Sequence, residues 1–60
     1  MAAAIIGKVK GRMEHNLEVK WDEYNQEVFV KSEIWTYVCK APSPGEALKK
    51  AGEWVKEKGL

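Results

Sequence analysis

The chain has 60 residues, a formal net charge of +1 and a single cysteine, Cys39, with 32% charged and 10% aromatic residues. A chain this short buries only about 60% of the surface that it exposes when unfolded, so we expect one small domain over residues 1–60. With so small a net charge, bulk charge favours no particular partner. One cysteine excludes an internal disulfide and favours a cytoplasmic location, and no run is apolar enough to predict a membrane span or a membrane partner.

The first predicted strand covers about residues 4–13, where two sets of residues alternate. One set is apolar and contains Ile5, Val9 and Met13. The other set is mainly cationic and contains Ile6, Lys8, Lys10 and Arg12. Gly7 and Gly11 lie on the apolar side, where they predict a bend, a bulge or close packing by a large neighbour.

The next two predicted strands cover about residues 17–22 and 27–31 and form a hairpin. A two-residue turn at Tyr24-Asn25 gives a register with one apolar face and one charged pair on the other face. The expected pairs are Trp21 with Val28, Val19 with Val30, and Glu18 with Lys31.

The fourth predicted strand covers about residues 34–40 and ends before Pro42, which cannot continue a ladder. Its register depends on the length of the preceding loop, and both registers stay open. An even loop places three residues beside Val28 and Val30, namely Trp35, Tyr37 and Cys39. An odd loop places Ile34, Thr36 and Val38 there and moves Trp35 and Tyr37 to the opposite face with Phe29.

A helix is predicted over about residues 44–58. Ser43 suits the N-cap, Pro44 the first helical position, and Gly59 the C-terminal stop. The apolar residues that follow form one stripe, made of Ala47, Leu48, Ala51, Trp54 and Val55. The predicted fold class is α+β, an antiparallel meander of three to four strands followed by one C-terminal helix packed on one sheet face.

One helix covers only one face of the sheet, so the other face is the candidate site. We expect the helix to cover the face of Ile5, Val9, Leu17, Val19, Trp21, Val28 and Val30. The uncovered face then carries the cations Lys8, Lys10, Arg12, Lys20 and Lys31. Its aromatic residues are Phe29 and, in the odd register, Trp35 and Tyr37. Because bases stack on rings while cations follow phosphates, this face predicts nucleic-acid binding.

The same face has two other interpretations. Tryptophan, tyrosine and arginine anchor protein interfaces, and a marginal domain gains stability from a partner, so a protein partner or a homodimer is the alternative. Lysines on a solvent-facing sheet can also serve only to keep it soluble and to block edge pairing. Binding of phosphates weakens steeply with salt and an apolar interface does not, so salt separates the two binding functions.

Catalytic and metal chemistry is not indicated. His15 lies in a predicted turn and is the only histidine, and a metal site needs further ligands at suitable spacing. Cys39 as a nucleophile would need a base and an oxyanion donor nearby. We therefore expect a non-enzymatic protein with no metal, no cofactor and no small-molecule substrate.

Three stretches of the chain together resemble part of a known family. Leu17-Glu-Val-Lys-Trp-Asp-Glu and Val28-Phe-Val-Lys-Ser form the hairpin with its acidic turn, and Ser43-Pro-Gly-Glu-Ala-Leu starts the helix. Over residues 17–55 this order resembles the N-terminal module of HicB-type antitoxins. The chain adds an N-terminal strand and lacks the glycine-rich connection usual before that helix. The resemblance implies a small dimerising protein that inhibits a partner toxin.

Overall fold

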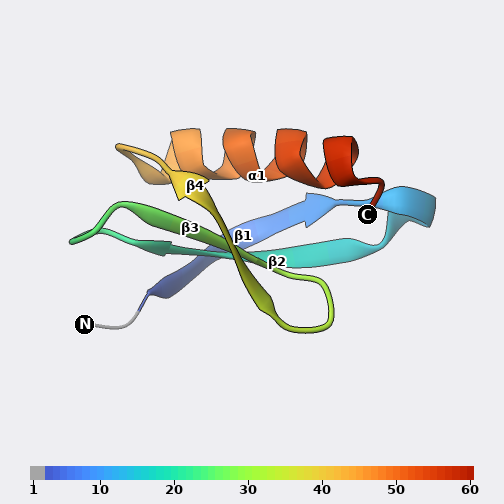
Figure 1. Cartoon of the computed structure of the whole chain (residues 1–60), viewed down its shortest axis with the longest axis horizontal. Helices are drawn as coiled ribbons and strands as arrows, with labels where there is room; N and C mark the ends of the chain where they lie inside the picture. Colours follow the sequence, from blue (N-terminus) through green and yellow to red (C-terminus); the bar gives the residue numbers. More distant parts are fainter. Residues whose placement is uncertain (1–2) are drawn as a thin grey trace.

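The computed structural model describes residues 3–60, apart from the side chain of Glu14. Its elements are the strands β1 (Ala4–Lys10), β2 (Asn16–Asp22), β3 (Glu27–Lys31) and β4 (Trp35–Lys40), the short 3-10 helix η1 (Arg12–Glu14) and the helix α1 (Pro44–Lys58). The strands form one antiparallel sheet in the order β1-β2-β3-β4, and α1 packs across one face of it (Figure 1). The fold class is α+β, as predicted; residues 1 and 2 of the expected domain lie outside the described residues.

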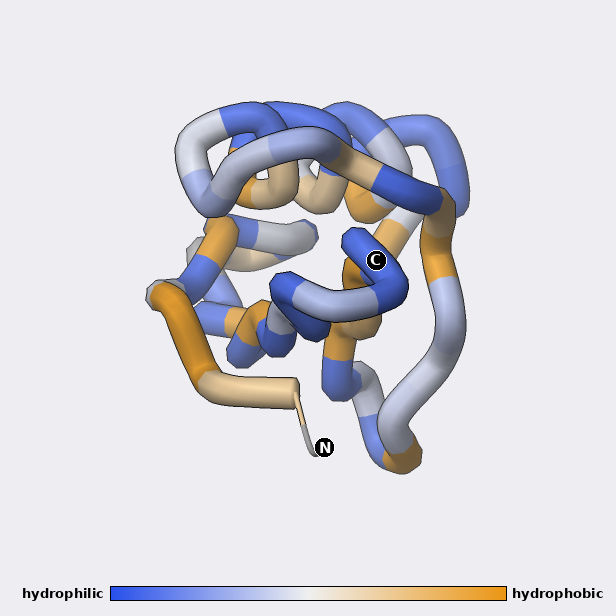
Figure 2. Tube along the Cα trace, turned by 90° about the vertical axis from the view of Figure 1, so that its left-hand side faces the viewer, coloured by the Kyte–Doolittle hydropathy of each residue, from blue (hydrophilic) through white to orange (hydrophobic). Residues whose placement is uncertain are grey.

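The helix has the predicted bounds and the predicted end signals. The Ser43 hydroxyl accepts a hydrogen bond from the backbone N–H of Glu46 at 3.3 Å, and Pro44 occupies the first turn. At the other end Gly59 adopts a left-handed conformation, with φ 75°, that glycine tolerates best. Hydrophobic residues of α1 face the sheet and hydrophilic residues lie on its outer side (Figure 2).

The core lies between α1 and the sheet. Its buried residues come from the two central strands, the loop before the helix and the helix itself: Leu17, Val19, Val28, Val30, Ala41, Ala47, Ala51 and Val55. Trp21 and Trp54 pack against this core, and the Trp21 indole N–H donates to the carbonyl of Ala41 at 3.0 Å. The helical stripe and the apolar face of the hairpin are thus joined as predicted.

A bulge in β1 overturns the predicted side for Ile5 and Ile6. Ile5 pairs with Lys20, whereas Gly7 pairs with Val19, so Ile6 is the extra residue. The shift of one residue turns Ile5 away from the helix, where it is 57% exposed, and lets Ile6 pack against the core. The prediction that Ile5 belongs to the helix-covered face, with Ile6 opposite, was therefore wrong.

Gly7 lies at this bulge, beneath a side chain of the helix. A Cβ atom at Gly7 would lie 3.2 Å from Cδ2 of Leu48, which is tighter than ordinary van der Waals contact. The bulge and the close packing by a large neighbour are both features that the sequence predicts for this glycine. They bring β1 close to α1.

The first strand also ends earlier than predicted. β1 stops at Lys10, and η1 follows, with Met13 in a left-handed conformation at φ 55°. The backbone N–H of Arg12 donates to the carbonyl of Leu60, which ties η1 to the end of the helix. A Cβ atom at Gly11 would collide with Leu60 and with the side chain of Leu17. Arg12 and Met13 therefore do not continue the alternation of the strand.

The hairpin of β2 and β3 has the predicted register, with Trp21 opposite Val28 and Val19 opposite Val30. Its turn is wider than the predicted Tyr24-Asn25 turn, because the last pair is Asp22 with Glu27 and residues 23–26 form the turn. Within this turn Gln26 has a positive φ, of 59°.

The Asp22 carboxylate explains how this turn is stabilised. It is only 7% exposed and accepts hydrogen bonds from the backbone N–H groups of Tyr24, at 2.9 Å, and Asn25, at 3.3 Å. The side-chain amide of Asn25 donates to its second oxygen at 3.2 Å. The bond from the Asn25 backbone, supported by that of Tyr24, holds the pKa of Asp22 below its ordinary value in spite of its burial. Asp22 therefore caps the turn.

A bulge in β4 combines the two registers that the sequence leaves open. Cys39 pairs with Val28, as in the even register, and Tyr37 pairs with Phe29, as in the odd register. Val38 is the extra residue and packs against the core. Ile34 precedes the strand and is 72% exposed, so the place on the core face that the odd register gives it was wrong, whereas Thr36 does pair with Val30.

Within residues 3–60, α1 is too short and too polar to cross a membrane, and no other helix there could do so.

Candidate nucleic-acid interface

The face of the sheet opposite α1 carries most of the predicted site. We call it the open face and define it by the strand residues Ile5, Lys8, Lys10, Glu18, Lys20, Phe29, Lys31, Trp35 and Tyr37. Two rows of cross-strand neighbours cross it from β1 to β4. One row is Ile5, Lys20, Phe29 and Tyr37, and the other is Lys8, Glu18, Lys31 and Trp35.

The aromatic side chains gather on the β3–β4 half of the open face. The rings of Phe29 and Tyr37 meet edge to face, with centroids 5.8 Å apart and an interplanar angle of 69°. Phe29 and Trp35 are half-buried, and Tyr37 is 49% exposed. An edge-to-face pair contributes about 0.5–1.5 kcal/mol beyond the area that it buries. The rings therefore support one another while their remaining surface stays accessible.

Two lysines lie directly over this aromatic cluster. The Lys20 ammonium nitrogen is 4.2 Å from the ring centroid of Trp35 and 6.0 Å from that of Phe29. The Lys31 ammonium nitrogen is 5.8 Å from the Trp35 centroid. Each such cation–π contact contributes about 0.5–1 kcal/mol where solvent reaches it. The structure thus brings together five of the eight residues predicted for the site.

The remaining lysines of the open face lie on β1. Lys8 and Lys10 are exposed and extend the positive charge away from the rings. Glu18 sits between Lys8 and Lys31 in the second row and is half-buried. The residues that define the open face therefore include four lysines and one carboxylate. The next cross-strand row on the same side of the sheet, towards the β2–β3 turn, is Asp22, Glu27 and Lys40. The defined open face is therefore net positive although the whole chain is almost neutral.

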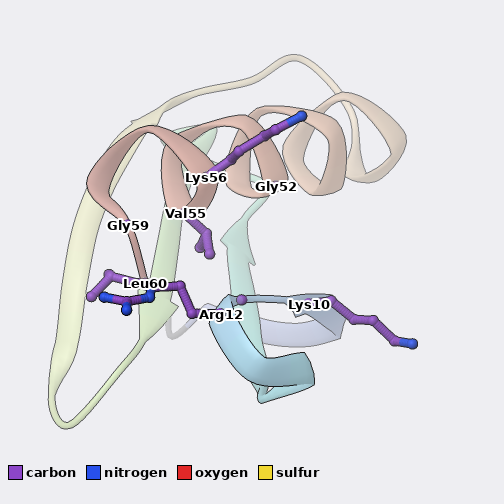
Figure 3. A pocket seen from close by; sticks show the side chains of 8 residues that line it. Lys10, Arg12, Gly52, Val55, Lys56, Gly59 and Leu60 are labelled. Atoms are coloured by element: carbon purple, nitrogen blue, oxygen red, sulfur yellow. The ribbon is translucent and has the colours of Figure 1, made fainter.

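Arg12 is the one predicted site residue that the structure moves elsewhere. It lies in η1 and lines a hollow of about 360 Å³ beside the C-terminal end of α1. Lys10 and Lys56 also line this hollow, but their side chains diverge from each other (Figure 3). The helix end contributes the negative end of its dipole, so the hollow does not concentrate positive charge on one point.

Sequence reasoning missed Ile5 as a member of the open face. Gly7 predicts an irregularity in this strand, but the alternating pattern does not show which residue a bulge would add. Ile5 lies opposite Lys20 and ends the row that contains Phe29 and Tyr37. It adds an exposed apolar side chain to that row.

Within the part of the chain that the structure describes, no three His, Cys, Asp or Glu side chains gather as metal ligands. His15 is exposed, and Cys39 is a half-buried free thiol opposite Val28 on the helix-covered face. The two residues therefore lie on different parts of the fold, and neither belongs to the open face.

Comparison of the chain with protein-family models, with curated proteins and with solved structures gives no match. The open face is therefore the feature of this chain that points to a function.

Proposed function

We propose that this chain is a small non-enzymatic, cytoplasmic protein that binds nucleic acid through the open face. One observation carries the proposal: the uncovered face of the sheet holds Phe29, Trp35 and Tyr37 in one cluster with Lys20 and Lys31 over the rings. Stacking surfaces next to cations are what a polynucleotide requires, since bases stack on rings and phosphates pair with ammonium groups.

An ordinary solvated sheet surface accounts for the lysines but not for the rings. Three aromatic side chains collected on one exposed face form an apolar patch that monomeric proteins usually avoid unless it binds something. The core, with Trp21 and Trp54 packed against it, lies on the other side of the sheet, so these three rings are not needed to build it. This contrast favours a binding role over a purely solubilising one.

The charge of the open face favours an anionic occupant over a second copy of the same face. Two copies packed face to face would bring Lys8, Lys20 and Lys31 of each copy together, with Glu18 as the counter-charge among them and Glu27 nearer the hairpin end. Like charges forced together in an interface cost free energy. A polyanion instead gains from the same lysines.

The direct test is the binding of a labelled single-stranded oligonucleotide of mixed sequence, followed by fluorescence anisotropy. If four lysines contact phosphates, affinity falls about 50-fold between about 50 mM and about 200 mM salt. The double variant K20E/K31E should lose binding. The matched control K49E/K50E makes the same charge change on exposed positions of α1 and should bind far better.

Two results would count against the proposal. Absence of binding by the unaltered protein at low salt would refute nucleic-acid binding. Equal binding by K20E/K31E and K49E/K50E would refute the open face as the site.

The second candidate function is a protein-interaction module, dimeric or antitoxin-like. The exposure of Ile5 beside the aromatic row favours it, because an apolar side chain adds little to phosphate recognition and much to a protein contact. Such an interface would respond weakly to salt, and K20E/K31E would spare it. A salt-insensitive dimer, measured by sedimentation, is the result expected from this alternative.

A further inference from the structure

Lys20 covers the ring that is best suited to stack on a base. Its ammonium group lies nearer to Trp35 than to Phe29, at 4.2 Å against 6.0 Å. Lys20 belongs to β2 and Trp35 to β4, so the side chain of Lys20 reaches across β3. The half-buried lysine stem lies on the sheet while its charge rests on the indole.

A base cannot stack on the same side of the Trp35 ring while the ammonium occupies it. The energy of one cation–π contact is small, so a stacking base can displace it. The displaced ammonium then stays beside the bound base, where the phosphate of the same nucleotide offers a stronger, charge-assisted partner.

We propose that the open face binds single-stranded nucleic acid and that Lys20 moves from the Trp35 ring to a backbone phosphate when a base stacks on Trp35. This inference rests on the proposed function and specifies its ligand and its first contact. Trp35 is the surface on which the base stacks, and the Lys20 ammonium that the base displaces binds the phosphate of the same nucleotide.

The width of the sheet argues for a single strand. Four strands at a spacing of about 4.8 Å span about 14 Å between outer strands, which exceeds the major-groove width of about 12 Å. The rings also need exposed base faces, and a duplex keeps those faces stacked inside. The open face therefore fits splayed bases rather than a groove.

Preference for base sequence should be weak. The groups around the rings are the ammonium groups of Lys20 and Lys31, which recognise charge rather than the edge of one base. Stacking and phosphate contacts are common to DNA and RNA. The test therefore measures binding of an oligodeoxyribonucleotide and of an oligoribonucleotide of the same sequence separately.

The first measurement compares a labelled mixed-sequence single strand with the same sequence annealed into a duplex, at about 50 mM salt. We expect the single strand to bind at least about tenfold more tightly, the gain from one stacked base. A duplex that binds as tightly would overturn this inference while leaving nucleic-acid binding intact. Failure of every ligand to bind would instead refute the proposed function.

The second measurement uses the variant K20M, which keeps the aliphatic stem and removes the charge. It should lose one phosphate contact, so its slope of log affinity against log salt becomes shallower by about 0.7. Uncovering the ring should recover about two- to five-fold in affinity, so K20M should be about two- to three-fold weaker at about 50 mM salt and close to the unaltered protein at about 200 mM.

The control variant is K8M, which removes a lysine of the same face in the other row. It should weaken binding at both salt concentrations, because no ring is uncovered in exchange. An unchanged salt slope in K20M would show that the ammonium does not reach a phosphate and would overturn the proposed transfer. Circular dichroism of both variants should match that of the unaltered protein.

Discussion

The ammonium nitrogen of Lys20 lies 4.2 Å from the ring centroid of Trp35, although β3 separates the strands that carry the two residues. The contact depends on the bulge at Val38, because that extra residue turns Trp35 to the open face while Cys39 stays opposite Val28. A continuous ladder from Cys39 would place Trp35 under the helix. One irregularity in an edge strand therefore creates the candidate site.

The first prediction concerns the stacking role of Trp35. W35A should weaken binding of a single-stranded oligonucleotide by about 10- to 100-fold, since each base stacked on an aromatic side chain contributes about 1–3 kcal/mol. The control is Y24A, which removes an aromatic side chain that is 74% exposed in the hairpin turn, outside the cluster. Anisotropy titrations of both variants give the comparison, and equal losses would contradict a specific role for Trp35.

The second prediction tests the β1 bulge. I6A should lower the free energy of unfolding by about 1–2 kcal/mol because Ile6 packs against the core. I5A should change it by less than about 0.5 kcal/mol, because Ile5 projects from the open face. Urea denaturation of the two variants measures the difference. If I5A were the more destabilising variant, Ile5 and not Ile6 would pack against the core, and the bulge would be contradicted.

The third prediction concerns acid. Hydrogen bonds to the Asp22 carboxylate hold its pKa below the ordinary value of 3.8, so the folded state binds its proton less readily than the unfolded chain does. The stabilisation is complete above that value and is lost as the pH falls through the lower pKa of the folded state. Thermal unfolding should therefore show a falling Tm on acidification, and D22N should show a smaller fall over the same range.

The fourth prediction concerns the start of α1. S43A should destabilise the protein by about 1 kcal/mol, because the hydroxyl that accepts from the Glu46 N–H is removed. S32A, in the exposed β3–β4 loop, is the matched control and should leave the Tm unchanged. Thermal melts followed by circular dichroism suffice, and equal stability of the two variants would show that the cap contributes nothing.

The features that follow from local pattern were predictable from the sequence. The helix is fixed by Ser43, Pro44 and Gly59, whose roles depend on neighbouring backbone groups only. The hairpin register follows from the need to keep Val19 and Val28 on one side. Local sequence is sufficient in both cases.

The extra residue of the β1 bulge and the existence of the β4 bulge were not predictable, and they decide the membership of the open face. Ile6 and Val38 are apolar residues that the ladder skips because each packs into the core from its edge strand, a gain that depends on the docked helix. The alternating pattern alone assigns Ile5 to the wrong face and leaves the face of Trp35 undecided. Arg12 was misplaced for a related reason, since its backbone bond to Leu60 joins opposite ends of the chain.

The most direct test of the open face uses the three indole N–H signals in a ¹H–¹⁵N spectrum recorded during titration with a single-stranded oligonucleotide at low salt. Trp21 donates its indole proton to Ala41 and Trp54 packs against the core, whereas Trp35 lies on the open face. We predict that the Trp35 signal shifts as the ligand is added, while those of Trp21 and Trp54 remain in place. A titration in which the Trp35 signal does not move, or in which only the Trp54 signal moves, would contradict the account.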